Sequence, residues 1–172
     1  MGRDRRFGYF PSAGLSWLLQ NEPFMETLRD KFLDQAKIRV GVGQSGRAPN
    51  GNYVYVGSFK AGDNYLNISS IEPNRIHLDK LKWETSTEYN IGADFSLFDG
   101  RLRLTLDYYE RYAKDLLQKN VNIASSTGFS KINYFNSGKM TNKGWEARAD
   151  VVIYNGGGWQ ISGNVNLSRN EN

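Results

Sequence analysis

Residues Trp83 to Leu117 read WETSTEYNIGADFSLFDGRLRLTLDYYERYAKDLL, two alternating segments joined at Asp99-Gly100. Apolar residues occupy every second position from Tyr89 to Leu97, and again from Leu102 to Tyr108. Such alternation is typical of β-strands with one apolar face and one polar face. Asp-Gly is a preferred pair for a two-residue type I′ turn. The stretch therefore predicts a β-hairpin.

The turn also predicts the register of this hairpin. With Asp99 and Gly100 as the two turn residues, Phe98 lies opposite Arg101, and counting outward places apolar residues across from apolar residues. The other face is polar, with Gly92 opposite Asp107. Because the turn chemistry and the apolar pattern predict the same register independently, we expect every apolar side chain of the hairpin on one face.

An apolar face of this kind packs either on a second sheet in a soluble sandwich or against lipid in a membrane barrel. Strands of soluble domains usually have about five to six residues. The two arms of this hairpin can stay extended for roughly fifteen residues, more than the ~10 that a tilted strand needs to cross a bilayer. The length of the arms favours the barrel.

The rest of the chain repeats this pattern. Short connections alternate with two long segments, 45–81 and 118–139, which are rich in Gly, Asn and Ser and are expected to be loops without regular structure. Short turns on one side and long loops on the other are typical of outer-membrane barrels. The expected strands are 6–19, 36–44, 82–98, 101–117, 140–154 and 159–170.

Six strands are too few to close a membrane barrel, because the smallest single-chain barrels use eight. The sequence therefore predicts an all-β, antiparallel up-and-down meander that forms part of a transmembrane β-barrel with long extracellular loops. Aromatic residues fall near both ends of the expected strands, as two interfacial girdles would. They are Trp17, Phe98 and Trp159 at the short-turn ends and Trp83, Tyr108, Tyr112 and Trp145 towards the long loops.

The connection between the first two strands carries a helical pattern. Pro23 suits the first turn of a helix, and Phe24, Leu28 and Phe32 recur every four residues, with Met25 and Leu33 beside them. We interpret this segment as a connecting helix or turn tucked against the barrel rim. The alternative is a helix that lies on the membrane surface or binds a partner.

Composition excludes several functions. The 172 residues include no cysteine, which excludes disulfides and thiolate chemistry, and the net charge of +4 comes without a basic stripe, so nucleic-acid binding is not expected. His77, the only histidine, lies in a loop without a partner nucleophile or metal ligand at a telling spacing. No catalytic, metal or cofactor site is therefore predicted. The first residues lack the apolar core of a signal peptide, so we interpret the chain as a fragment of an exported protein.

Four stretches stand out in order along the chain. They are FGYFPSAGLSW (Phe7 to Trp17), KIRVGVGQSG (Lys37 to Gly46), KWETSTEYNIGADFSLFDGRLRLTLDYYERYAKDLL (Lys82 to Leu117), and STGF with NSGKMTNKGWEARADV (Asn136 to Val151). Together they resemble the SusC/RagA-like TonB-linked outer-membrane proteins of the Bacteroidota. The stretches occur in the family's order, and the resemblance covers nearly the whole chain.

This resemblance implies a C-terminal portion of a roughly 22-stranded barrel in the outer membrane. It also implies import of a glycan or peptide ligand together with a SusD-like surface lipoprotein. Energy would come from the TonB complex, through a plug domain and TonB box that are not among these residues. Outer-membrane lipid would surround the barrel.

If the polar face lines the lumen, its side chains are candidates to bind ligand. The alternative is that they pair across strands or with the plug and keep the interior wet. The lumen candidates are Glu88, Asn90, Asp94, Arg103, Asp107 and Tyr109. Loop aromatics are candidates to stack on sugars or to pack on a lipoprotein lid, with ordinary loop packing as the alternative. They are Tyr53, Tyr55, Tyr65, Tyr134 and Phe135.

Two rival functions remain open at this point. A soluble carbohydrate-binding β-sandwich would bury the apolar face against a second sheet. An outer-membrane barrel enzyme, such as a lipase or protease, would need a Ser-His or acid constellation, and the sequence has none that is recognisable.

Overall fold

The computed structural model describes residues 2, 6–29 and 31–172, together with all their side chains except that of Tyr65. The chain divides into two compact units. The sheet unit comprises Pro11–Gln44, Thr87–Tyr112 and Thr141–Asn172, and the loop unit comprises Met1–Phe10, Ser45–Ser86 and Ala113–Met140. Each unit is described by itself below.

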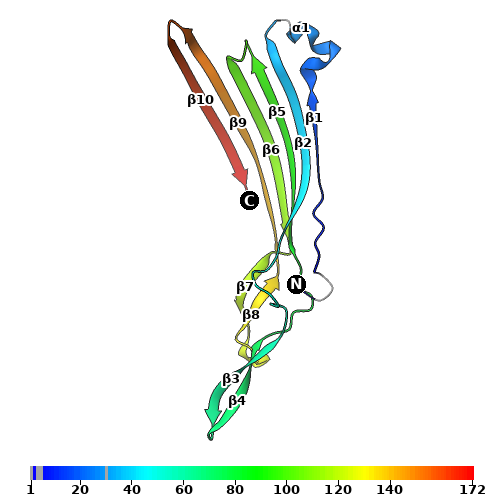
Figure 1. Ribbon diagram of the computed structural model, residues 1–172, viewed down its shortest axis with the longest axis vertical. Coiled ribbons are helices and arrows are strands. Elements are labelled where there is room, and N and C mark those ends of the chain that lie inside the picture. The colour runs from blue at the N-terminus through cyan, green and yellow to red at the C-terminus, as the bar shows by residue number, and fades with distance from the viewer. Residues whose placement is uncertain (1, 3–5, 30) are drawn as a thin grey trace. The chain divides into compact units, whose positions relative to one another are not determined.

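The sheet unit is built on six strands that neighbour one another in chain order, β1-β2-β5-β6-β9-β10 (Figure 1). This is the predicted up-and-down meander, and all six expected strands are present. Their bounds are β1 Ser12–Leu18, β2 Leu33–Arg47, β5 Glu84–Leu97, β6 Leu102–Lys114, β9 Lys139–Gly156 and β10 Trp159–Glu171.

Most strand boundaries lie within three residues of the predicted ones, and the largest difference is at the start of β1. β1 begins only at Ser12, directly after Pro11, whose missing N–H cannot take part in a ladder. β2 begins earlier than predicted, at Leu33, so Leu33 belongs to a strand and not to the helical stripe. Leu33 and Ala36 are buried, and the Ala36 N–H donates to the side-chain oxygen of Gln20 at 3.1 Å, which holds the start of β2 against the preceding connection.

The turn between β5 and β6 has the predicted central residues. Asp99 and Gly100 have φ angles of 57° and 74°, as in a type I′ turn, and the Arg101 N–H donates to the Phe98 carbonyl at 3.2 Å. Phe98 also has a positive φ, 59°, so it belongs to the turn and not to the extended strand predicted to include it. The carboxylate of Asp34 accepts the N–H groups of Asp99 and Gly100 at 3.2 and 2.8 Å. The start of β2 therefore holds this turn in place.

The two faces of the sheet separate apolar from polar side chains. In the pairing of β1 with β2, Leu15 lies opposite Val40 and Trp17 opposite Ile38. At the other edge of the sheet, Val165 of β10 lies opposite Ala149 of β9. These side chains are uncovered: Leu15 is 76% and Val165 59% exposed. In the described part of the sheet unit no second sheet packs on the apolar face. A β-sandwich would bury this face.

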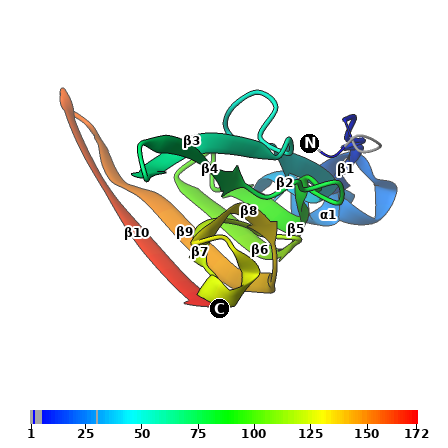
Figure 2. The same ribbon diagram turned by 90° about the horizontal axis from the view of Figure 1, so that it is seen from below.

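The loop unit corrects one expectation, because the two long segments are not structureless. Each folds into its own hairpin, which lets the backbone N–H and C=O groups bond to one another. The hairpins appear as separate two-stranded ribbons in Figure 2. Their elements are β3 Ser58–Tyr65, β4 Ile68–Arg75, β7 Leu117–Asn122, η3 Ser125–Thr127 and β8 Lys131–Asn136.

The connection from β1 to β2 consists of three short helical turns. They are η1 Leu19–Asn21, η2 Pro23–Met25 and α1 Glu26–Arg29, and Pro23 occupies the first turn as predicted. Among the described residues no helix is long and apolar enough to cross a membrane.

The separation of the faces predicts unequal tolerance to charge. In the complete barrel that includes these strands, Leu106→Arg places a charge on the apolar face, where Leu106 is 48% exposed. We expect it to lower the free energy of unfolding by about 2–4 kcal/mol if the site lies near the bilayer midplane. Thr105→Arg, the neighbouring position on the polar face, is the matched control and should change stability little. Samples are heated to a series of temperatures before electrophoresis, and the readout is the temperature at which the band of the folded barrel disappears. Equal shifts of this temperature for both variants would refute the assignment of the faces.

Candidate functional site

The polar face of the sheet is organised by one arginine that links three strands. Arg39 of β2 donates from Nε to Asp94 Oδ2 at 2.8 Å and from Nη2 to Asp94 Oδ1 at 3.1 Å. The same Nη2 atom donates to Asp107 Oδ1 at 3.1 Å. Asp94 lies on β5 and Asp107 on β6, so a single guanidinium bridges to two carboxylates on successive strands.

Gly92 leaves the space in which this bridge forms. A Cβ atom at Gly92 would lie 2.5 Å from Asp107 Oδ1 and 2.8 Å from Arg39 Nη2, closer than side chains tolerate. A side chain at this position would push the Asp107 carboxylate and the Arg39 guanidinium aside, so the glycine leaves room for the salt bridge. In the register predicted from the turn, Gly92 lies opposite Asp107, and this contact agrees with that register.

Other lumen candidates are also engaged with side chains on other strands of the sheet. Glu88 Oε2 accepts from Arg111 Nη2 at 2.7 Å and from Arg111 Nε at 2.9 Å. The Tyr109 hydroxyl donates to Asn170 on β10. With Asp94 and Asp107 this accounts for four of the six candidates, and the engagement is of the cross-strand kind that the alternative interpretation expects.

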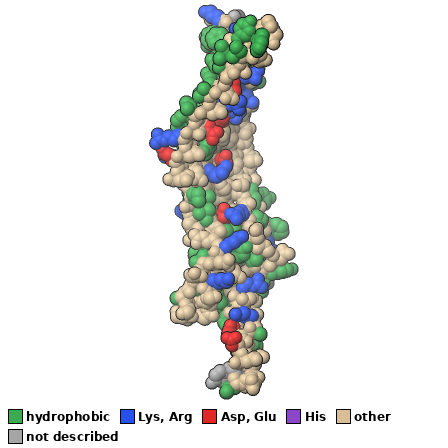
Figure 3. Space-filling model, turned by 90° about the vertical axis from the view of Figure 1, so that its left-hand side faces the viewer, with side chains coloured by type: hydrophobic (Ala, Val, Ile, Leu, Met, Phe, Trp, Pro, Cys, Tyr) green, Lys and Arg blue, Asp and Glu red, His purple; other side chains and the backbone are tan. Residues whose placement is uncertain are grey.

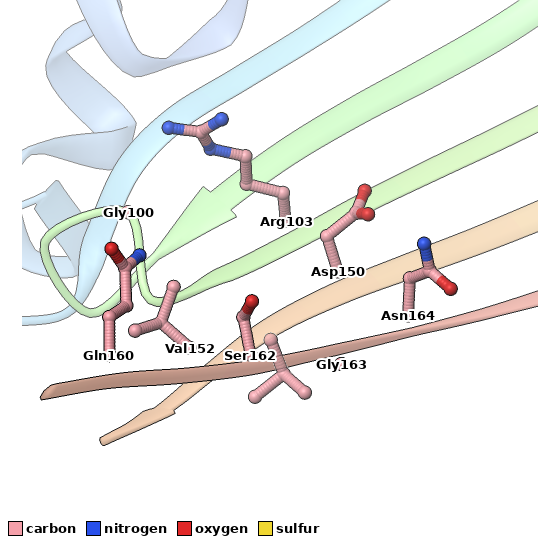
Figure 4. A pocket seen from close by; sticks show the side chains of 9 residues that line it. Gly100, Arg103, Asp150, Val152, Gln160, Ser162, Gly163 and Asn164 are labelled. Atoms are coloured by element: carbon pink, nitrogen blue, oxygen red, sulfur yellow. The ribbon is translucent and has the colours of Figure 1, made fainter. Parts of the chain in front are cut away.

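The remaining candidate with a charge, Arg103, lines a shallow hollow of about 410 Å³ on the polar face. Figure 4 shows Arg103 of β6, Asp150 of β9 and Asn164 of β10 projecting from three adjacent strands, with Gln160 and Ser162 nearby. Donors and acceptors therefore converge there, which suits sugar hydroxyls or peptide groups. Asn90 lies on the same face of β5 and is half-buried.

Sequence reasoning did not single out Arg39, Asp150 or the β10 side chains. The available signal was weak, because each is one polar residue in an alternating strand, and alternation shows the face but not which side chains meet. Acidic and basic groups lie intermixed along the face shown in Figure 3 and do not form separate patches.

The loop unit has a small apolar core that includes one predicted ligand residue. Val54, Leu81 and Tyr134 are buried together, and the Tyr134 hydroxyl donates to the Asn50 carbonyl at 2.8 Å. Tyr134 therefore serves loop packing in this structure. Tyr53 and Phe135 are more open, at 74% and 45% exposed.

Two other aromatic candidates and the histidine complete the description of the loops. Tyr55 is half-buried and its ring lies edge-on to His77, with centroids 6.0 Å apart, while the side chain of Tyr65 lies outside the described residues. His77 is a surface residue, as expected, whose Nε2 lies 2.6 Å from Asp79 Oδ1. No group of three His, Cys, Asp or Glu side chains among the described residues is placed to hold a metal ion.

A cluster that we call the clasp joins segments far apart in the loop-unit sequence. Asn136 Oδ1 accepts the Lys82 N–H at 2.8 Å, and its Nδ2 donates to the carbonyls of Lys82 and Asp115 at 3.0 and 2.9 Å. Glu84 Oε2 accepts the Leu117 N–H at 2.9 Å. We define the clasp as Lys82, Glu84, Asp115, Leu117 and Asn136.

The residues of the clasp come from three of the short strings that carry the family resemblance. Lys82 and Glu84 belong to KWE, Asp115 and Leu117 to KDLL, and Asn136 opens NSGK. These strings meet through hydrogen bonds from the Asn136 and Glu84 side chains to backbone groups, which gives them a structural role in this chain. A hollow of about 490 Å³ lies beside the clasp, between the segment 77–82 and Tyr134, Phe135 and Asn136.

A single-layered antiparallel meander with an uncovered apolar face and a charged, internally paired polar face is the wall of an outer-membrane β-barrel. The family model described as TonB dependent receptor-like, beta-barrel matches residues 2–172. The chain therefore belongs to the TonB-dependent receptor β-barrel family, an outer-membrane family of receptors and transporters and not of enzymes.

Curated relatives agree with this assignment. The chain is 32% identical over 171 residues to TonB-dependent receptor P39 of Formosa agariphila, covering 99% of this chain and 16% of that protein. It is 30% identical over 181 residues to TonB-dependent receptor SusC of Bacteroides thetaiotaomicron, covering 98% of this chain and 17% of SusC. The chain thus spans about a sixth of the length of these relatives.

Solved structures of the RagAB peptide importer have the same fold. In the open-open state the match has a TM-score of 0.81 and 25% identity, over 99% of this chain and 18% of that one. In the closed-closed state the TM-score is 0.83, with 24% identity over 98% of this chain and 18% of that one.

The bridge at Arg39 predicts a stability effect that depends on linking strands. In the complete barrel, Arg39→Gln leaves two neighbouring carboxylates without their shared cation, and we expect a loss of about 1–2 kcal/mol. Arg148→Gln is the matched control, because Arg148 pairs with Asp150 on its own strand at 2.8 Å and ties no strands together. Thermal loss of the folded band should shift more for position 39, and adding Asp94→Asn and Asp107→Asn should restore part of the loss. A larger shift at position 148 would contradict the bridging role.

The clasp predicts local loosening of the loops. Asn136→Ala removes three hydrogen bonds to backbone groups, which we expect to destabilise the loop unit by about 2–3 kcal/mol. Asn136→Asp keeps the acceptor for the Lys82 N–H but sets a carboxylate oxygen against the two carbonyls, so its effect should be at least as large as that of Asn136→Ala. Limited proteolysis of the complete protein, with cleavage sites mapped by mass spectrometry, should show faster cutting within residues 113–140. Unchanged cutting in both variants would show that the clasp does not hold these segments.

Proposed function

We propose that this chain forms part of the wall and extracellular loops of a TonB-dependent importer that carries an oligosaccharide or peptide across the outer membrane. The observation that carries the proposal is the polar, internally paired face of a sheet whose other face is apolar and uncovered. Membership of the receptor family and the likeness to the RagAB peptide importer support it.

In this function the polar face of the sheet keeps the lumen wet. The salt bridges of Arg39 and Glu88 neutralise charge along the strands, and the hollow at Arg103, Asp150 and Asn164 offers hydrogen-bonding groups to a passing ligand. The chain makes and breaks no covalent bond. Energy reaches the barrel from the TonB complex through parts of the protein outside these residues.

The loops meet the ligand and a SusD-like surface lipoprotein that closes over the barrel. Tyr53 and Phe135 are the predicted aromatics best placed for this, because large parts of their rings face solvent. Aromatic rings stack on the apolar faces of sugars and also pack well in protein interfaces.

The location of the complex is the outer membrane of a Bacteroidota-like cell.

The soluble sugar-binding sandwich has no structural support. It requires the apolar face to be buried, whereas the largest apolar side chains of that face are exposed in the described sheet.

Gentle extraction tests the assembly directly. A tagged copy at the native locus, solubilised in mild detergent and analysed by intact mass, should give a chain about six times as long as these 172 residues, judged from the coverage of the relatives. A surface lipoprotein should copurify with it. A free, water-soluble polypeptide of this length alone would overturn the proposal.

Growth tests the transported class. Deletion of the gene should abolish growth on one oligosaccharide or peptide as sole carbon source, while growth on its monosaccharides or amino acids continues. Restoring the gene should restore growth only in cells with an intact TonB system. Equal growth of deleted and intact strains on all such substrates would contradict import.

A further inference from the structure

The connection between β1 and β2 is more exposed than its pattern predicts. Phe24 is 64% and Leu28 39% exposed, and η1, η2 and α1 contain no buried residue. The apolar stripe of the connection is therefore not buried against the described end of the sheet. An apolar helical turn left open needs another partner.

One aromatic contact shows in which direction that partner lies. The rings of Trp17 and Phe24 meet edge to face, with centroids 6.4 Å apart. Trp17 lies on the apolar face of β1, where its pairing opposite Ile38 continues the pairing of Leu15 with Val40. Phe24 therefore extends the apolar face of the sheet beyond the end of the strand.

Two polar contacts hold the described part of this region together. Trp17 Nε1 donates to Glu22 Oε1 at 2.8 Å, while the side chain as a whole stays 48% exposed. Glu26 pairs with Arg29 at 3.7 Å. An aromatic ring with a bonded polar edge and an open apolar body is the arrangement that favours a membrane-water interface.

A second aromatic pair lies at the same end of the sheet. Phe32 stacks on Phe98 with centroids 5.9 Å apart, and the Phe98 N–H donates to the Phe32 carbonyl at 2.9 Å. Figure 1 shows α1 and the β5–β6 turn at one end of the sheet. This end carries the short turns, which face the periplasm in outer-membrane barrels.

We propose that the β1–β2 connection is an interfacial anchor, with Phe24 and Leu28 seated among phospholipids of the periplasmic leaflet beside Trp17. Lipid is the occupant because the exposed side chains continue the face that contacts the bilayer along β1. The connection lies at the level where that bilayer ends. This inference rests on the proposed outer-membrane location.

The test measures the environment of position 24 in the complete protein. Phe24→Cys, in a background without other cysteines, is labelled with a nitroxide and reconstituted in vesicles of phosphatidylethanolamine and phosphatidylglycerol. Electron paramagnetic resonance then measures how often the nitroxide collides with two reagents. Frequent collision with oxygen indicates a lipid environment, and frequent collision with a water-soluble nickel chelate indicates water. Leu28→Cys is a second test position in case the first variant does not assemble.

Two further labels calibrate the result. Leu15→Cys reports the apolar face of β1, and Glu26→Cys, whose side chain is 66% exposed, reports the polar side of the connection. The ratio of oxygen to nickel collision at positions 24 and 28 should approach that at position 15 and exceed that at position 26 several-fold.

Other results overturn the inference in distinguishable ways. Nickel access at positions 24 and 28 equal to that at position 26 would place the connection in water. Protection from both reagents would show that it packs on protein. If position 15 itself is open to nickel, the outer-membrane location fails and the anchor fails with it.

Discussion

Inside a bilayer every backbone N–H and C=O group must find its partner within the protein, because the hydrocarbon offers none. For this chain the requirement is met by six neighbouring strands in chain order, joined on one side by connections short enough to keep neighbours paired. Once the ladder is imposed, side chains alternate between two faces, and one face must be apolar while the other stays wet. The remaining features of the sheet follow from that division.

The wet face then has a problem of its own, since it carries charged groups on strands that must lie close together. On β2, β5 and β6 the Arg39 guanidinium neutralises two carboxylates. Gly92 has no side chain, which leaves room for this contact. At the end of the same strands, Asp34 accepts two N–H groups of the β5–β6 turn. Both devices bind strands through groups that a ladder alone leaves unused.

The loop unit is stabilised differently. Its apolar core is small, with Val54, Leu81 and Tyr134 at its centre, and the clasp around Asn136 supplements it with hydrogen bonds to backbone groups. Three of the short strings that carry the family resemblance, KWE, KDLL and NSGK, meet in the clasp.

The sequence by itself determined the elements whose causes are local. The Asp99-Gly100 turn, the register it implies, the alternation of six strands and the family all follow from residues near one another in the chain. Tertiary structure alone decided which polar side chains meet. Arg39 is 55 residues from Asp94 and 68 from Asp107, and nothing in their local patterns pairs them.

The same reason accounts for the expectations that were incomplete. Glycine- and asparagine-rich segments indicate turns, but whether two stretches pair as β3–β4 or β7–β8 depends on contacts across the segment. Tyr134 reads as one loop aromatic among several until the fold buries its ring beside Leu81. Whether Phe24 is tucked in or left open is likewise set by what lies next to it in space, which a periodic pattern does not contain.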